Sequence, residues 1–116
     1  MKVLIVDDDP HIRKLYKEEL EEDGYEVIVA ATGTEALELF EKENPDLITL
    51  DILMPDIDGI KLLRQMKEKR PRVPIIMSTA YDYRDDFAVW ASEAYIVKSA
   101  ELAELKETIK KLLSKQ

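Results

Sequence analysis

The chain has 116 residues, no cysteine and a formal net charge of −8 at neutral pH. This length fits one compact domain, the lack of cysteine excludes disulfides and thiolate sites, and the negative charge argues against general nucleic-acid binding. The first apolar run meets acids at position 7, so it is too short for a signal peptide or a membrane span. We therefore expect a cytoplasmic domain over residues 1–116, with no output domain in this chain, no membrane partner and no direct nucleic-acid contact.

Apolar runs alternate with amphipathic stretches five times along the chain. The runs predict strands near residues 2–7, 26–30, 46–51, 74–79 and 94–97. The first, third and fourth are apolar enough to be buried on both faces, whereas the second is expected at or near an edge. This alternation predicts an α/β fold built on a parallel sheet.

The first two helices carry clear capping signals. Asp9 is suited to the N-cap of the first helix and Pro10 to its first helical position, and Gly24 stops it. The side chains that this helix should bury are Ile12, Leu15, Tyr16 and Leu20. The second helix opens with a T-x-x-E capping box from Thr32 to Glu35 and ends at Asn44-Pro45. It should turn Ala36, Leu37 and Phe40 inward.

Two further helices are predicted after the third and fifth strands. One starts near Asp58-Gly59 and should pack Ile60, Leu63 and Met66. The last runs from about Glu101 to Lys115, with glutamate early and lysine late. Its apolar stripe consists of Leu102, Leu105, Ile109, Leu112 and Leu113.

Polar residues stand at the carboxyl ends of the predicted strands. Asp7-Asp8-Asp9 ends the first run and Asp51 ends the third. Ligands of open parallel sheets bind outside the carboxyl ends of the strands, so these carboxylates could converge on a hard cation such as Mg²⁺. Ser78-Thr79 adds hydroxyls and Lys98 adds an ammonium group at two other strand ends. Together these groups predict a phosphoryl-transfer site.

The motifs resemble the receiver domain of two-component response regulators. In chain order they are Val6-Asp7-Asp8-Asp9, Leu50-Asp51 with Met54-Pro55-Asp56-Ile57-Asp58-Gly59, Ser78-Thr79-Ala80, and Lys98. Each motif alone is weak, but the set in this order covers nearly the whole chain. The resemblance implies a flavodoxin-like (βα)5 fold, similar to that of chemotaxis regulators. Its five-stranded parallel sheet would have the strand order 2-1-3-4-5 and helices on both faces.

The resemblance also implies the roles of the site residues. Asp51 would be the phospho-acceptor and would take a phosphoryl group from a phosphohistidine of a sensor histidine kinase or a phosphotransfer protein. Magnesium would be held by Asp8, Asp51 and the backbone carbonyl of Leu53, with Asp7 acting directly or through water. Lys98 would pair with phosphoryl oxygens.

Two more residues would respond to phosphorylation. Thr79 would offer its hydroxyl to the phosphate; Ser78 is the rival hydroxyl, but Thr79-Ala80 matches the hydroxyl-small pair of the family and Ser78 would face the opposite side of the sheet. Tyr95 matches the aromatic switch position. The output surface would comprise the helix after Thr79, the strand at 94–97 and the last helix. An unknown downstream protein would read this surface, and the chain would be a monomer or a weak homodimer.

Several residues also have purely structural interpretations. Asp56 and Asp58 fit turn geometry and the start of the third helix. Asp51 and Lys98 could form a buried ion pair. His11 is the only histidine, so sites that need several histidines are excluded, and we expect it on the solvated surface.

The chain departs from the family pattern in two places. Ser99 follows Lys98, where family members typically have a proline after a cis bond; a cis bond before serine costs about 3–4 kcal/mol, so a trans bond is expected. The segment between Thr79 and Tyr95 is short by about one helical turn. Its helix should therefore be stunted or remodelled.

Several functions remain open at this point. The leading hypothesis is a signalling switch that catalyses only its own phosphorylation and dephosphorylation and is otherwise not an enzyme. The alternatives are a receiver cut from a longer protein and a phosphorylation-independent, receiver-like interaction module. A Mg²⁺-dependent phosphatase with an aspartate nucleophile is disfavoured, because the second acid expected two residues after Asp51 is replaced by Leu53.

Overall fold

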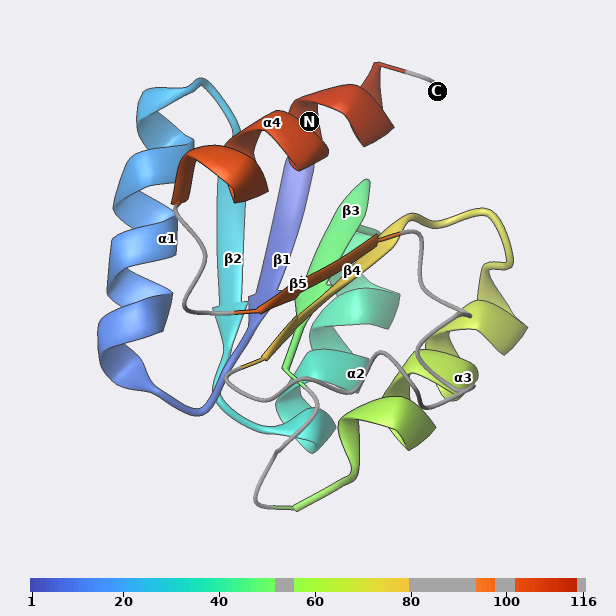
Figure 1. Ribbon diagram of the computed structural model, residues 1–116. Helices are drawn as coiled ribbons and strands as arrows, with labels where there is room; N and C mark the ends of the chain where they lie inside the picture. The colour runs from blue at the N-terminus through green and yellow to red at the C-terminus, as the bar shows by residue number, and fades with distance from the viewer. Residues whose placement is uncertain (52–55, 80–93, 98–101, 115–116) are drawn as a thin grey trace.

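The computed structural model describes residues 1–51, 56–79, 94–97 and 102–114. Their elements follow in chain order: β1 Lys2–Val6, α1 Pro10–Glu22, β2 Glu26–Ala30, α2 Gly33–Glu43, β3 Leu47–Leu50, α3 Gly59–Lys69, β4 Ile75–Thr79, β5 Ala94–Val97 and α4 Leu102–Leu113 (Figure 1). Each predicted strand agrees with an observed strand to within a residue at either end. The helix expected between β4 and β5 falls outside the described residues, so α4 is the helix predicted from about Glu101 to Lys115.

The strands form one parallel sheet in the order β2-β1-β3-β4-β5. β1 pairs with β2 on one side and with β3 on the other, so that Val3 lies opposite both Val27 and Leu47. The predicted strand order and the edge position of β2 are thereby confirmed. All residues of β3 are buried, as are Val3 to Val6 of β1, because helices cover both faces of the sheet here.

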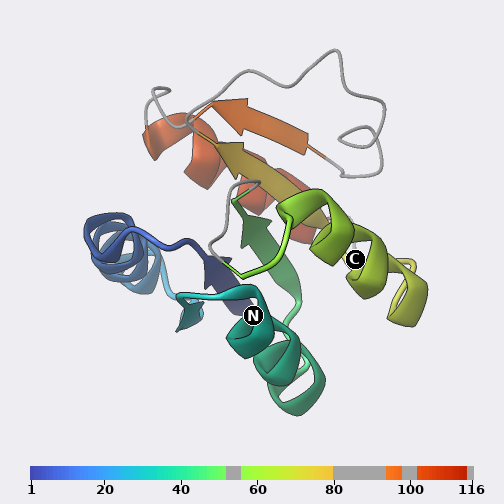
Figure 2. The same cartoon turned by 90° about the horizontal axis from the view of Figure 1, so that it is seen from below.

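Of the helices that the structure describes, α1 and α4 cover one face of the sheet and α2 and α3 cover the other (Figure 2). Successive strand residues point to opposite faces, so one strand supplies both cores. Val3 and Ile5 face α1 and α4, together with Tyr16, Leu20, Leu105 and Ile109. Leu4 and Val6 face α2 and α3, together with Phe40, Leu62, Leu63 and Met66.

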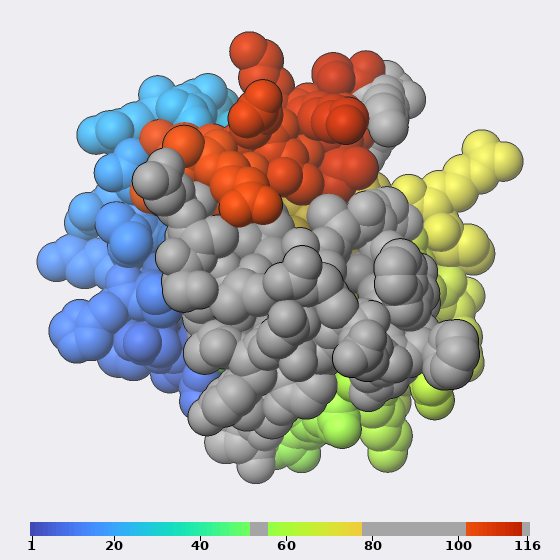
Figure 3. Space-filling model, in the orientation of Figure 1, coloured from blue at the N-terminus to red at the C-terminus, as the bar shows by residue number. Residues whose placement is uncertain are grey.

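Helix α4 lies against α1 on the face seen in Figure 3. The Lys106 ammonium nitrogen is 2.8 Å from a carboxylate oxygen of Glu19 and 3.6 Å from one of Asp23. The hydrogen bond to Glu19 raises the pKa of Lys106 above its usual value of 10.5. This pairing joins two helices that are far apart in the sequence.

One predicted core residue of α1 is wrong. Tyr16 and Leu20 are buried and Ile12 packs beside them, but 43% of Leu15 is exposed. Ile12, Tyr16 and Leu20 recur every four residues and form one stripe. Leu15 precedes Tyr16 by one residue, or about 100° around the helix, and so lies on the margin of that stripe.

The helix ends confirm most of the predicted caps. The side chain of Asp9 accepts a hydrogen bond from the backbone N–H of His11 at 2.9 Å, with Pro10 in the first turn. Gly24 follows α1 with a φ of +94°, a conformation that side chains rarely adopt. Asn44 ends α2 in the left-handed region with a φ of 49°. His11 is exposed, as expected.

The capping box of α2 is only half formed. Thr32 accepts from the backbone N–H of Glu35 at 3.2 Å, as the T-x-x-E pattern predicts. The carboxylate of Glu35, however, accepts from the backbone N–H of Ala31 at 2.9 Å rather than from that of Thr32. The Glu35 carboxylate therefore binds the residue before the N-cap and stabilises the turn between β2 and α2.

Candidate metal and phosphoryl site

Three carboxylates meet at the carboxyl edge of the sheet. The ligand oxygens of Asp7, Asp8 and Asp51 all lie within 4.8 Å of one another. Asp7 follows β1 and Asp51 follows β3, and these two strands are neighbours, so parallel pairing alone brings their ends together. Asp7 and Asp51 are buried and Asp8 is exposed, which leaves one side of the cluster open to solvent.

Backbone hydrogen bonds fix this cluster to its neighbours. The N–H of Asp51 donates to the carbonyl of Val6 at 3.0 Å, and the N–H of Asp7 donates to the carbonyl of Ala30 at 3.1 Å. The ends of β1, β2 and β3 are thus bonded to one another immediately beside the acids.

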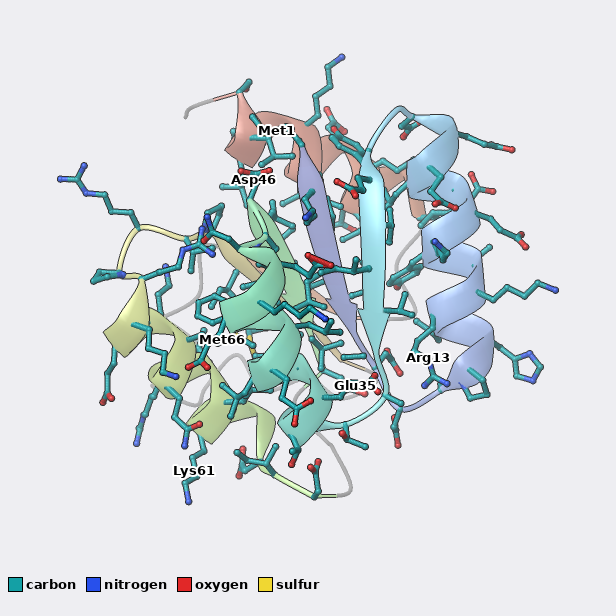
Figure 4. All side chains as sticks on the ribbon, turned by 180° about the vertical axis from the view of Figure 1, so that it is seen from behind. Met1, Arg13, Glu35, Asp46, Lys61 and Met66 are labelled. Carbon is teal, nitrogen blue, oxygen red and sulfur yellow. The ribbon has the colours of Figure 1, made fainter. Side chains whose placement is uncertain are left out.

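Arg13 supports the turn after β1 from helix α1. Its Nη1 donates to the backbone carbonyl of Asp7 at 2.8 Å. The N–H of Asp9 donates to the carboxylate of Asp7 at 2.9 Å. Figure 4 shows Arg13 near the carboxyl ends of β1 and β2, with Met1 and Asp46 at the opposite end of the sheet. The sequence did not single out Arg13, although a cation in the first turn of a helix is an unusual choice.

The donor set suits a hard divalent cation. Carboxylate oxygens are ligands that Mg²⁺ prefers, and a one-sided opening leaves room for the waters that Mg²⁺ keeps. Negative groups this close together gain from a cation between them.

Part of the predicted site belongs to segments that the structure does not describe. Leu53, Lys98 and Ser99 lie outside the described residues, as does the segment 80–93. The backbone of Thr79 ends β4, with Val97 as its partner in β5, and Tyr95 pairs with Met77. The roles of the Thr79 and Tyr95 side chains stay predictions, and so does the choice of Thr79 over Ser78.

Asp56 has a partner that the sequence did not reveal. We expected it to serve the turn before α3, but its carboxylate accepts from the backbone N–H groups of Gly33 and Thr34, at 2.8 and 3.0 Å, and from the Thr34 hydroxyl at 2.7 Å. The hydrogen bond from the Thr34 hydroxyl, followed by those from the backbone, lowers the pKa of Asp56 below its usual value of 3.8. Asp58 behaves as predicted and caps α3 by accepting from the N–H of Ile60 at 2.8 Å.

The sequence profile of the response regulator receiver domain matches residues 3–110. The chain belongs to this family. The fold and the acidic cluster are those expected for a receiver domain, and the resemblance seen in the sequence is confirmed. Within the described residues, no helix has the length and apolar character needed to cross a membrane.

Known receivers resemble the chain over nearly its full length. The response regulator protein TrrA from Thermotoga maritima, solved in complex with Mg²⁺-BeF, is 48% identical with a TM-score of 0.91; the match covers 96% of this chain and 97% of TrrA. TrrA has also been solved in complex with the histidine kinase ThkA; that match has 49% identity, a TM-score of 0.90 and 97% coverage of both chains.

A curated relative from Bacillus subtilis is longer than this chain. The alkaline phosphatase synthesis transcriptional regulatory protein PhoP is 37% identical over 115 residues, which is 97% of this chain but 48% of PhoP. The chain spans about half the length of the first curated relatives that it matches.

Proposed function

We propose that the chain is a phospho-accepting receiver in a two-component phosphorelay, and that Asp51 takes a phosphoryl group from a histidine kinase in a Mg²⁺-dependent reaction. The observation that carries this proposal is the convergence of Asp7, Asp8 and Asp51, with ligand oxygens within 4.8 Å of one another. Such a cluster can hold a cation beside a carboxylate nucleophile, which is the arrangement that phosphoryl transfer to an acid requires.

Asp51 supplies the attacking oxygen. One of its carboxylate oxygens forms the new bond to phosphorus while the bond between phosphorus and the donor's imidazole nitrogen breaks, and the electron pair stays on that nitrogen. Because Asp51 is 5% exposed, the donor must approach from the open side of the cluster. That side is marked by Asp8, the exposed member of the three acids.

The ligands of the metal would come from both strand ends. Asp8, Asp51 and the backbone carbonyl of Leu53 would hold Mg²⁺, with Asp7 acting directly or through water. When bound, Mg²⁺ offsets the negative charge of the transferring phosphoryl group. The Mg²⁺-BeF complex of TrrA supports this assignment.

The remaining proposed roles concern the residues that would respond once Asp51 carries the phosphoryl group. Lys98 would pair with its oxygens and Thr79 would offer a hydroxyl. Tyr95 would report this change on the surface formed by the segment after Thr79, β5 and α4. In this scheme the chain catalyses only its own phosphorylation and dephosphorylation, and a downstream protein reads the result.

The donor would be a sensor histidine kinase or a phosphotransfer protein. The complex of TrrA with the histidine kinase ThkA supports a donor of this kind. The net charge of −8 disfavours direct contact with nucleic acid. We expect the chain to be a monomer or a weak homodimer.

The test is intact-mass analysis after incubation with acetyl phosphate and Mg²⁺. A single phosphoryl adduct is expected on the parent protein. It should be absent from Asp51→Asn, which lacks the nucleophilic carboxylate, and from the parent treated with a chelator. Asp58→Asn is the matched control, because it makes the same change at a carboxylate that caps α3 and lies outside the acidic cluster, and it should form the adduct.

Two outcomes would contradict the proposal. An adduct that persists in Asp51→Asn would place the acceptor elsewhere. No adduct on the folded parent, with acetyl phosphate or with a phosphorylated histidine kinase as donor, would favour the phosphorylation-independent interaction module.

A further inference from the structure

We propose that Asp56 is a positioning residue for the acidic cluster: by binding the N-terminus of α2, it closes a ring of contacts that holds Asp51 beside Asp7 and Asp8. This inference rests on the proposed function, because it concerns how the same site is kept in shape. It assigns to Asp56 a role distinct from the turn geometry expected from the sequence.

The contact is unusually complete for an exposed carboxylate. Both oxygens of Asp56 are used: Oδ1 accepts from the Gly33 N–H, and Oδ2 accepts from the N–H and the hydroxyl of Thr34. Gly33 and Thr34 open α2, where N–H groups have no partner within the helix and the helix dipole favours a negative charge. The partners are separated by 22 or 23 residues, so this is a tertiary contact and not a local cap.

An apolar contact lies directly beside the polar one. Ile57 packs against the core on the α2 and α3 face of the sheet. A Cβ atom added to Gly33 would overlap the side chain of Ile57, so the two residues approach as closely as a glycine allows. Asp56 and Ile57 therefore anchor the chain before α3 to the start of α2 in two different ways.

The anchor completes a ring around the cluster. The N–H of Asp51 donates to the carbonyl of Val6 at the end of β1. The residue after Val6 is Asp7, and its N–H donates to the carbonyl of Ala30 at the end of β2. The chain from Ala30 leads in a few residues to Thr34, which binds Asp56. The covalent chain from Asp56 back to Asp51 closes the ring.

Because of this ring, the contact of Asp56 with α2 affects the position of the acidic cluster. Asp7 and Asp51 are members of the ring, and Asp8 follows Asp7 directly. Without Asp56, the chain after Asp51 loses its hydrogen bonds to the start of α2, and of the two contacts of this anchor the packing of Ile57 remains. Groups that hydrogen-bond directly to metal ligands typically change metal affinity by about 10–100-fold when they are removed, and Asp56 acts on the ligands one step further away.

The experiment compares Mg²⁺ affinity in parent, Asp56→Ala and Asp58→Ala by isothermal titration calorimetry. Asp58→Ala is the matched control: it removes an aspartate that caps a helix two residues further on, but its bond to Ile60 is local. We expect about tenfold weaker Mg²⁺ binding in Asp56→Ala, at the lower limit of effects of this kind. Asp58→Ala should bind Mg²⁺ like the parent.

A second readout does not need the metal. Hydrogen exchange of the Asp51 amide, measured by NMR without Mg²⁺, should be faster in Asp56→Ala than in the parent and unchanged in Asp58→Ala. Urea unfolding of both variants shows whether their overall stability differs. Thr34→Ser, which keeps the hydroxyl, should match the parent in both readouts, whereas Thr34→Val should move part of the way toward Asp56→Ala.

The outcomes separate this inference from the proposed function. A folded Asp56→Ala protein with the Mg²⁺ affinity and Asp51 exchange of the parent would overturn the inference alone. So would equal losses in Asp56→Ala and Asp58→Ala, since a general loss of stability would then explain both. A parent that binds no Mg²⁺ and accepts no phosphoryl group would overturn the proposed function, and the positioning role with it.

Discussion

At Gly33, the absence of a Cβ atom allows α2 to pack closely against Ile57. This glycine is the first residue of α2 and is buried against Ile57. Its φ does not lie in the left-handed region, because the residues with positive φ among those described are Gly24 and Asn44. Glycine is therefore required here by space and not by backbone conformation. In a helix, alanine would otherwise be favoured over glycine.

The variant Gly33→Ala should destabilise the protein by about 1–3 kcal/mol, as overpacking does. The new methyl group would meet the branching methyl group of Ile57, and β-branched side chains have few alternative rotamers. Urea unfolding measures the loss. Adding Ile57→Leu, which removes that branching methyl group, should restore part of the stability. If Gly33→Ala is as stable as the parent or more stable, the close contact is not a constraint.

Residue roles were predictable where the partner is local. Asp9, Thr32 and Asp58 cap the helices that follow them through neighbours two or three residues away. Asp56 looked like the same kind of residue, yet its partners belong to another helix. Nothing in the local pattern distinguishes the two cases, because the arrangement of α2 beside the chain before α3 arises only when the sheet is assembled.

At the scale of the elements, periodicity predicted the helices better than their exact faces. In α1, the apolar pattern contains both Leu15 and Leu20, but only Leu20 is buried. The apolar stripe of an amphipathic helix covers an arc of about 100° or more around the helix axis. A residue at the edge of this arc can therefore be buried or exposed, depending on the neighbouring helix. That neighbour is α4, whose position relative to α1 cannot be read from α1 alone.

This difference between two leucines of one helix is testable. Leu20→Ala should cost about 2–5 kcal/mol, because it leaves a cavity beside β1 and α4. Leu15→Ala makes the same chemical change at a position that is 43% exposed, and surface changes usually stay within about 0.5 kcal/mol. Urea unfolding of both variants gives the comparison. Similar losses in the two variants would contradict the observed orientation of α1.

At the scale of the whole molecule, the sheet order brings the acids together. Asp7 and Asp51 are 44 residues apart in the sequence, but β1 and β3 are neighbours in the centre of the sheet. The sequence predicted this convergence from the rule that strand ends of a parallel sheet share one edge. It could not predict the supports of the cluster, such as Arg13 beneath the turn after β1, because a contact of one side chain with one carbonyl leaves no periodic signal.

The cluster should couple metal binding to the stability of the whole domain. An unfolded chain does not assemble Asp7, Asp8 and Asp51, so Mg²⁺ binds mainly to the folded protein and stabilises it by about 2.7 kcal/mol at a concentration of 100 times Kd. Thermal unfolding with Mg²⁺ and with sodium chloride of equal ionic strength separates this effect from charge screening, which a net charge of −8 makes necessary.

The decisive comparison uses two neutralised aspartates of the same turn. Asp8→Asn removes a member of the cluster, and we expect it to lose most of the stabilisation by Mg²⁺. Asp9→Asn removes the same charge one residue later; asparagine still caps α1, so the stabilisation by Mg²⁺ should remain. If both variants lose the stabilisation equally, it arises from a general attraction of Mg²⁺ to the negative charge of the domain and not from binding at the cluster. If only Asp8→Asn loses it, the cation is bound by the cluster, and each folded molecule then carries beside Asp51 the charge that phosphoryl transfer requires.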